Sequence, residues 1–421
     1  MCRQQRRGGP GHPQPRRAAG QRRPPDARRR LPHQCPLRTV RLQQPGADRP
    51  HPAGAPGRGE RVSVRFRSSP LAFAGLLLAA CGGGLHPDVD ISDDPPERLS
   101  ELGLVSWDGA AFTYAEGVFP YELNTPLFSD YAVKERAIYL PEGTSAVPGG
   151  PADVLDFPVG TAILKTFSLA PDLRTPGEGL SPIETRLLWR TEDGWEAWPY
   201  LWRDDGSDAD LHLGGRTLTL DFVDPDGEAR EAQYMVPQRN QCGECHQILV
   251  DDETVFTPIG PRPSHLAANG QLEAMVQAGL VSGLNVDDVV PTTVFAELDL
   301  ASLHGEALNT AARDYLDVNC AHCHRPDGVQ GVTSQLFLNR DNDDPFRLGI
   351  CKRPGSAGQG GGGLTYDIVP GAPEESILYF RLSTENPGAM MPLLGRSLAH
   401  TEGVDLIGAW IAAMEPDDCA E

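Results

Sequence analysis

The sequence lacks any hydrophobic run long enough to cross a membrane as a helix. Its longest apolar stretch, residues 71–80, is about half of the roughly 20 residues that a membrane-spanning helix needs. Basic side chains are also scarce after this stretch. Of the 37 Lys and Arg residues, 17 precede Cys81, whereas only 3 of the 58 Asp and Glu residues do, which leaves 20 basic and 55 acidic residues from Cys81 onward. Such a surface repels nucleic acid and anionic lipid, and it suits either cationic protein partners or simple solubility.

Aromatic residues make up only 7% of the chain, and four of the six Trp residues fall between Trp189 and Trp202. The segment 183–202 around Asp193-Gly194 predicts two antiparallel strands joined by a tight turn. Clustered Trp side chains can line a binding site for a glycan or a quinone-like molecule. Their alternation along the predicted strands favours the packed inner face of a sheet.

The pentapeptide Cys-x-x-Cys-His occurs twice, at 242–246 and at 320–324. It is the attachment sequence of c-type haem, because two thiols one helical turn apart reach both vinyl groups of a porphyrin and the adjacent His binds the iron. Zinc sites and redox thiols are the alternatives, but zinc-binding pairs usually lie about 15–20 residues apart and redox pairs need a βαβ unit. Two covalently bound haem c groups are therefore predicted, with thiols and imidazoles from Cys242, Cys245, His246, Cys320, Cys323 and His324.

The apolar stretch has the pattern of an export signal. It follows the basic segment 65–67 and ends in Leu-Ala-Ala-Cys at 78–81, which resembles a bacterial lipobox. We predict a lipoprotein signal peptide at 62–80, cleavage before Cys81 and a lipid on the Cys81 sulfur. An ordinary signal peptide followed by a chance cysteine is the alternative. The expected location is the periplasm, with a lipid anchor in the membrane, and the absence of Asp after Cys81 favours the outer membrane.

Residues 1–61 precede this signal and are rich in Arg and Pro without apolar periodicity. Because a secretory signal stands at the start of a chain, we interpret them as a leader from a mis-called start, with translation beginning near Val62 or Val64. A disordered basic tail is the alternative. Two further cysteines of the exported chain, Cys351 and Cys419, form an even pair in an oxidising compartment. They predict a disulfide that ties the C-terminus back, with free thiols as the alternative.

The exported chain predicts an α+β, multidomain protein. After a linker at 81–96, short strands and a turn at 224–227 indicate a β-rich N-terminal domain at 97–240, either a sandwich or a barrel. From residue 241 the pattern becomes that of an α-helical, cytochrome c-like region carrying both haems. Helices are expected at 270–279, 306–317, 373–382 and 401–414.

The second motif has a complete cytochrome c domain around it, at 306–421, with a helix before it and a Met-Pro loop and a helix after it. Met391, directly before Pro392, is its expected sixth iron ligand, and Met390 is the rival. A thioether opposite His favours a low-spin, electron-transferring haem.

The first motif lies in a shorter region, 241–305, and an extended segment precedes it. Met275 and His265 are the leading candidates for the sixth ligand of its iron. An iron with an open sixth position is a further alternative. Weaker candidates for this ligand are Met235, His304 and His400.

Several longer segments resemble a family of bacterial diheme c-type cytochrome lipoproteins. The resemblance lies in PYELNTPLFSDYAVKERAIYLP at 120–141, VPQRNQCGECH at 236–246, PIGPRPSHL at 258–266, YLDVNCAHCHRP at 315–326, and the tail segments YDIVPGAPEESILYFRLS and MMPLLG. It runs from about residue 95 to the C-terminus. It implies haem at both motifs but no established reaction.

These patterns predict a membrane-tethered periplasmic diheme cytochrome that transfers electrons between redox partner proteins, which include cationic cytochromes, and that binds no nucleic acid. One alternative is a diheme peroxidase-like enzyme with an open first haem, in which Glu244 or His265 acts as the acid/base group. Another is a binding module, in which the β-rich domain recognises a ligand through Trp195 or Trp198 while the cytochrome supplies electrons.

Overall fold

The structure of the chain is a computed structural model that describes residues 94–328, 335–355 and 357–419. The predicted leader, signal peptide and lipid-bearing Cys81, and most of the predicted linker, lie outside these residues. The described chain is α+β, with several antiparallel sheets followed by most of its helices. Within these ranges, no helix combines the length and apolarity needed to cross a bilayer.

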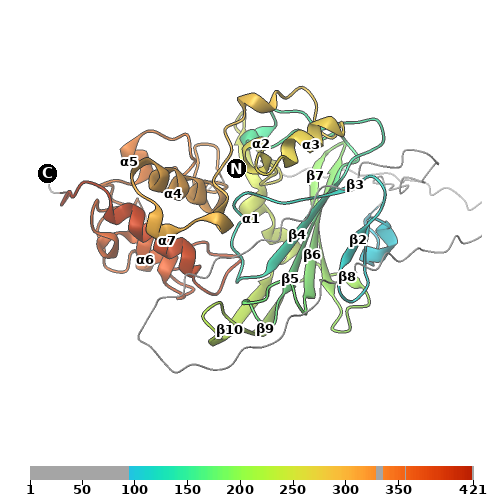
Figure 1. Cartoon of the computed structure of the whole chain (residues 1–421), viewed down its shortest axis with the longest axis horizontal. Helices are drawn as coiled ribbons and strands as arrows, with labels where there is room; N and C mark the ends of the chain where they lie inside the picture. The colour runs from blue at the N-terminus through green and yellow to red at the C-terminus, as the bar shows by residue number, and fades with distance from the viewer. Residues whose placement is uncertain (1–93, 329–334, 356, 420–421) are drawn as a thin grey trace, which may run out of the picture. The chain divides into compact units, whose positions relative to one another are not determined.

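A six-stranded antiparallel sheet organises the first half of the described chain (Figure 1). Its edges are β3 and β8, so the sheet is open and is not the barrel that was one of the two expectations. The strands lie side by side in chain order as β3 (Val118–Tyr121), β4 (Val133–Tyr139), β5 (Ala162–Leu169), β6 (Ser181–Thr191), β7 (Gly194–Trp202) and β8 (Ala209–Leu211). Two-stranded ribbons are formed by β1 (Val105–Trp107) with β2 (Phe112–Tyr114), β9 (Arg216–Val223) with β10 (Ala229–Val236), and β11 (Gln247–Val250) with β12 (Glu253–Phe256).

Two tight turns follow from local sequence. Thr191 pairs with Gly194, so Glu192 and Asp193 form the turn between β6 and β7, one residue earlier than predicted. The predicted turn at 224–227 joins β9 to β10, and its Gly227 takes a φ of 89°, which glycine adopts at little cost.

One face of the large sheet carries most of the Trp cluster, and we call it the Trp face. Leu164 on β5 pairs with Leu187 on β6, which pairs with Trp198 on β7, so the three side chains share this face. They belong to a buried core that also contains Trp189, Tyr200, Trp202 and residues of the turn η1 (Leu99–Leu102). The alternation therefore places these Trp side chains in the core, as the pattern favoured.

The opposite face, which we call the α-face, is covered at its two ends by different elements. At one end Phe167 on β5 packs against the β9–β10 ribbon through Tyr234. At the other end Ile138 and Ile163 pack against α2 (Pro263–Leu266) and α3 (Gln271–Gln277). The middle of the α-face lies between these two apolar clusters.

The C-terminal half is built from α4 (Gly305–Cys320), α5 (Pro345–Leu348), α6 (Ile377–Ser383) and α7 (Thr401–Ala412), coloured orange to red in Figure 1. Leu308, Ala312 and Leu316 recur at helical spacing on α4 and pack against Ile407 and Trp410 on α7. The predicted helix 373–382 is divided: a 3₁₀ turn at Pro373–Glu375 precedes α6.

The segment 122–131 fastens the sheet to these helices. The Phe128 amide donates to Asn319 on α4 at 2.8 Å, and the Asp130 carboxylate accepts from the Ser397 and Leu398 amides at 2.7 and 2.8 Å. Tyr131 donates to Glu402 on α7 at 3.0 Å. The conspicuous 120–141 sequence thus supplies contacts between the two halves of the described chain.

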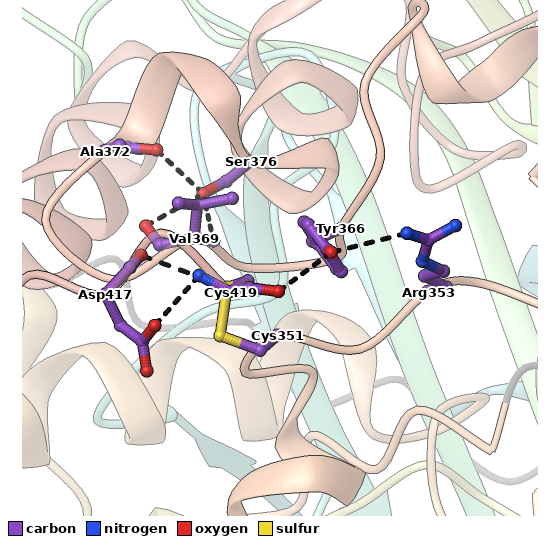
Figure 2. Close-up of a disulfide and its surroundings, with 8 residues drawn as sticks. All are labelled: Cys351, Arg353, Tyr366, Val369, Ala372, Ser376, Asp417 and Cys419. Atoms are coloured by element: carbon purple, nitrogen blue, oxygen red, sulfur yellow. Dashed lines mark hydrogen bonds between the residues drawn. A yellow bond between two sulfur atoms is a disulfide. The ribbon is translucent and has the colours of Figure 1, made fainter. Parts of the chain in front are cut away.

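Figure 2 shows how the C-terminal end is tied back. Cys351 and Cys419 form a disulfide that spans 68 residues of sequence. The Tyr366 hydroxyl donates to the Cys419 carbonyl at 2.9 Å, and the Cys419 amide donates to Asp417 at 2.8 Å. The chain after α7 is therefore held to the preceding structure by the disulfide and by the Tyr366 hydrogen bond, whereas the bond between Cys419 and Asp417 lies within this end segment.

Candidate functional site

The two Cys-x-x-Cys-His motifs meet in space although more than 70 residues separate them in the chain. Sγ of Cys245, a ring nitrogen of His322 and Sγ of Cys323 all lie within 4.8 Å of one another. The Cys323 thiol also lies 3.6 Å from the carbonyl oxygen of Glu244. A cleft between the motifs is lined by Cys245, His322, Thr257, Arg262 and Arg325, among others.

Each motif forms one helical turn, which explains why the spacing of its residues matters. In the first motif, which forms the short helix α1 (Gly243–His246), the His246 amide donates to the Cys242 carbonyl at 3.0 Å. In the second, which begins at the last residue of α4, the His324 amide donates to the Cys320 carbonyl at 2.9 Å. Cysteines three residues apart on such a turn lie on one side of it, and the His follows directly.

The four motif cysteines are unpaired, whereas Cys351 and Cys419 are joined. The Cys323 thiol beside Cys245, together with the His322 ring, lowers the pKa of the Cys245 thiol despite its burial. A thiol with a lowered pKa is more nucleophilic at neutral pH. Burial has the opposite effect at Cys320, where it raises the pKa to about 12.

The ring of His246 is held in one orientation. Its Nδ1 lies 3.0 Å from the Thr257 carbonyl oxygen, which can only accept, so Nδ1 carries the proton and Nε2 keeps its lone pair. The ring stacks on Phe256 at 5.3 Å between centroids and 9° between planes. Burial lowers the pKa of His246 to about 4, so the ring is neutral at pH 7 and can bind a metal.

The half-buried ring of His324 also has a pKa lowered by burial, to about 4. The backbone of Leu336 raises the pKa of this ring, which opposes the effect of burial. Among the described residues, no group lies in hydrogen-bond geometry with Nδ1 of His324. The Leu338 amide donates to the His324 carbonyl at 2.7 Å, which fixes the backbone of this residue. A second neutral imidazole is thus available beside the second cysteine pair.

The Met-Pro loop is fastened near the second motif. The Met391 amide donates to the Arg381 carbonyl at 3.0 Å, and Nε of the buried Arg396 donates to the Met391 carbonyl at 2.9 Å. Arg381 lies close enough to His324 to lower the pKa of its ring. Met390 is buried and Met391 is half-buried.

The two leading candidates for the sixth ligand of the first haem are occupied in other contacts. His265 is 3% exposed, and its Nε2 lies 3.3 Å from the carboxylate of Asp317 on α4. Met275 is buried in the apolar cluster between the sheet and α3. Of the weaker candidates, His400 stacks on Phe128 at 4.4 Å.

A buried ion cluster joins the neighbourhoods of the two motifs, and sequence reasoning missed it. Asp317 accepts hydrogen bonds from both terminal nitrogens of Arg262, from His265 and, at 3.1 Å, from the Arg340 amide. Asp317 lies on α4, one turn before Cys320, and Arg262 lies just before α2. A polar residue on the buried face of a helix could have indicated the cluster, but the sequence alone does not identify the residues that pair with it.

Comparison of the chain with protein-family models, with curated proteins and with solved structures found no match.

The donor set fits c-type haem on its chemistry. Each motif offers two free thiols and a neutral imidazole, and a Met-bearing loop lies near the second. The cluster of Cys245, His322 and Cys323 also supplies one nitrogen and two sulfur donors, which are the atoms that zinc prefers. Three donors leave one tetrahedral position open, and that site would use one cysteine from each pair.

Proposed function

We propose that this protein is a diheme c-type cytochrome that transfers electrons between redox partners. The observation that carries the proposal is the repeated turn of two unpaired thiols and one neutral imidazole, in a chain whose Cys351 and Cys419 are oxidised to a disulfide. Thioether bonds to haem would account for four thiols that remain unpaired in an oxidising compartment.

The chain's contribution is to hold both attachment turns side by side. Haem c supplies one-electron chemistry when bound. The contact between Cys245 and Cys323 supports attachment of the two groups next to each other, and the Asp317 cluster ties α4 to the segment that follows the first motif. His246 is oriented by the Thr257 carbonyl, and Arg396 fastens the loop that presents Met391.

We propose that the chain resembles the bacterial diheme cytochrome lipoproteins in function, that it works in the periplasm on a lipid anchor at Cys81, and that acidic surface charge favours cationic redox partners. Nucleic acid is not an expected partner because the charge has the wrong sign.

A peroxidase-like enzyme is the second candidate, and one observation favours it. His265 and Met275 are engaged elsewhere, so among the described residues neither leading candidate is free to become the sixth ligand of the first haem. An iron with an open position could bind peroxide or another small substrate.

Haem content and spin state test the proposal. We would produce the full chain in a bacterium that matures c-type haem and measure haem and zinc per chain, together with the electron paramagnetic resonance spectrum. Two haems per chain, falling to one in Cys242→Ala/Cys245→Ala and to one in Cys320→Ala/Cys323→Ala, are expected. Haem-free protein that retains zinc would refute it. A high-spin centre that disappears with the first cysteine pair would favour the peroxidase-like candidate.

A further inference from the structure

A row of basic side chains crosses the middle of the α-face. Arg136 on β4 pairs directly with Lys165 on β5, and Lys165 pairs directly with Arg186 on β6, so the three side chains share one face of three adjacent strands. Lys134, two residues before Arg136, lies on the same face. Like charges directly opposite each other destabilise a sheet, and basic residues are few in the exported chain. Because aligning these basic side chains has a cost, we expect a ligand of opposite charge to bind beside them.

Among the described residues, only one carboxylate, that of Glu184, lies at ion-pair distance from these three basic side chains. Arg186 forms an ion pair with Glu184 at 2.6 Å, and Glu184 also accepts from Tyr234 at 2.7 Å. No carboxylate of the described chain lies within ion-pair distance of Arg136 or Lys165. Arg136 is 6% exposed, and its buried Nη2 has no hydrogen-bond partner among the described residues. Its Nη1 donates to the Lys134 carbonyl at 3.4 Å, so the guanidinium has a backbone partner but no anion. A buried cation without an anion beside it is costly.

The row lies beside the first Cys-x-x-Cys-His motif. The apolar clusters cover the two ends of the α-face, and the cations lie between them. Strand β10 is joined to β6 by the hydrogen bond from Tyr234 to Glu184, and it ends shortly before the motif begins at Cys242. Val236, the last residue of β10, packs in the same buried cluster as Phe167, and Lys165 and Arg186 lie over the Phe167 ring at 4.8 and 4.4 Å from its centroid. The cations and the first attachment turn therefore belong to one site.

We propose that Arg136, Lys165 and Arg186 bind the propionate carboxylates of the first haem. The proposal rests on the proposed function, because the ligand belongs to the haem itself. A haem carries two propionates on the edge away from its vinyl groups. A guanidinium fork binds a carboxylate through two parallel hydrogen bonds, and an ammonium adds a point charge. A free dicarboxylate has the same chemistry, and the test below separates the two sources.

This arrangement would raise the reduction potential of the first haem. The oxidised iron carries one more positive charge than the reduced iron, so cations nearby disfavour oxidation, and they also cancel the charge of the propionates. No residue of the second motif belongs to this row, so these cations should not determine the reduction potential of the second haem.

The test is a redox titration of the haem-loaded protein with Lys165→Met, which removes the charge and keeps most of the side-chain length. We expect the midpoint potential of one haem to fall, that haem being the one lost in Cys242→Ala/Cys245→Ala, while the other stays unchanged. Lys165→Arg keeps the charge and should keep the potential, which separates charge from packing. Arg216→Gln is the matched control, because Arg216 is exposed on β9 and loses the same charge.

Three results would overturn the proposal, and they are distinguishable. Two haems with both potentials unchanged in Lys165→Met and in Arg136→Met would overturn the propionate site alone. A wild-type potential that shifts saturably with malonate at constant ionic strength, a shift that Lys165→Met abolishes, would assign the row to a free dicarboxylate instead. A wild-type chain without haem would overturn the proposed function as well.

Discussion

Replacing Asp317 by Asn tests whether the buried ion cluster holds the two motifs together. The Asp317 side chain is fully buried and pairs with Arg262, whose side chain is 9% exposed. Removing one partner of a buried, hydrogen-bonded ion pair leaves an uncompensated charge and typically costs about 3–5 kcal/mol. Asp317→Asn should therefore lower the free energy of unfolding by about that amount, measured by urea denaturation with Trp fluorescence at pH 7.

The effect of this substitution should depend on pH. Burial by itself would raise the pKa of Asp317, but the hydrogen bond from His265 and the charge of Arg262 outweigh it and hold the pKa well below its usual range. A depressed folded-state pKa stabilises the protein above the unfolded-state pKa, near 3.9, and this contribution is lost as the pH falls through the folded-state value. The difference between wild type and Asp317→Asn should therefore narrow below about pH 4.

Two further variants test whether the Asp317 cluster stabilises the fold through its buried charges. Asp210→Asn removes the partner of Arg203 in an exposed ion pair, and it should change the unfolding free energy little. Arg262→Met/Asp317→Asn removes both charges and should cost less than Asp317→Asn alone, because no buried cation is left unpaired. A loss below about 1 kcal/mol in Asp317→Asn, or a larger loss in the double variant than in the single one, would show that the cluster does not stabilise the fold as argued.

Three other predictions concern separate parts of the chain. Met391→Ala should abolish the near-infrared charge-transfer band of His–Met ligation while Met390→Ala retains it, and the reverse result would assign the ligand to Met390. Replacing Cys351 and Cys419 by Ser should lower the free energy of unfolding in urea by about 4 kcal/mol, because the disulfide closes a loop of 68 residues; an unchanged midpoint would contradict this. Burial raises the pKa of Glu135 to about 7, so its ionisation costs stability as the pH rises from about 4.5 to 7. Glu135→Gln should therefore raise Tm at pH 8 and leave it unchanged at pH 4, and equal shifts at both pH values would refute the assignment.

The sequence by itself determined the features that depend on neighbouring residues. The turn of each Cys-x-x-Cys-His motif closes through a hydrogen bond within five residues, and the turn at 224–227 is decided by its own Asp, Pro and Gly. The apolar repeat on α4 and α7 predicts both helices because the period of 3.6 residues is present in each segment. The strand alternation likewise places Trp189 and Trp198 on one buried face.

Tertiary structure alone decided which of these local features meet. Cys245 and Cys323 become neighbours through contacts such as that between Arg262 and Asp317, whose partners are 55 residues apart. The row of Arg136, Lys165 and Arg186 exists because of strand register, since a shift of one residue in one strand would turn that strand's cation to the opposite face. Both arrangements depend on contacts between segments that are distant in the sequence. The free energy of such contacts cannot be predicted from either segment alone.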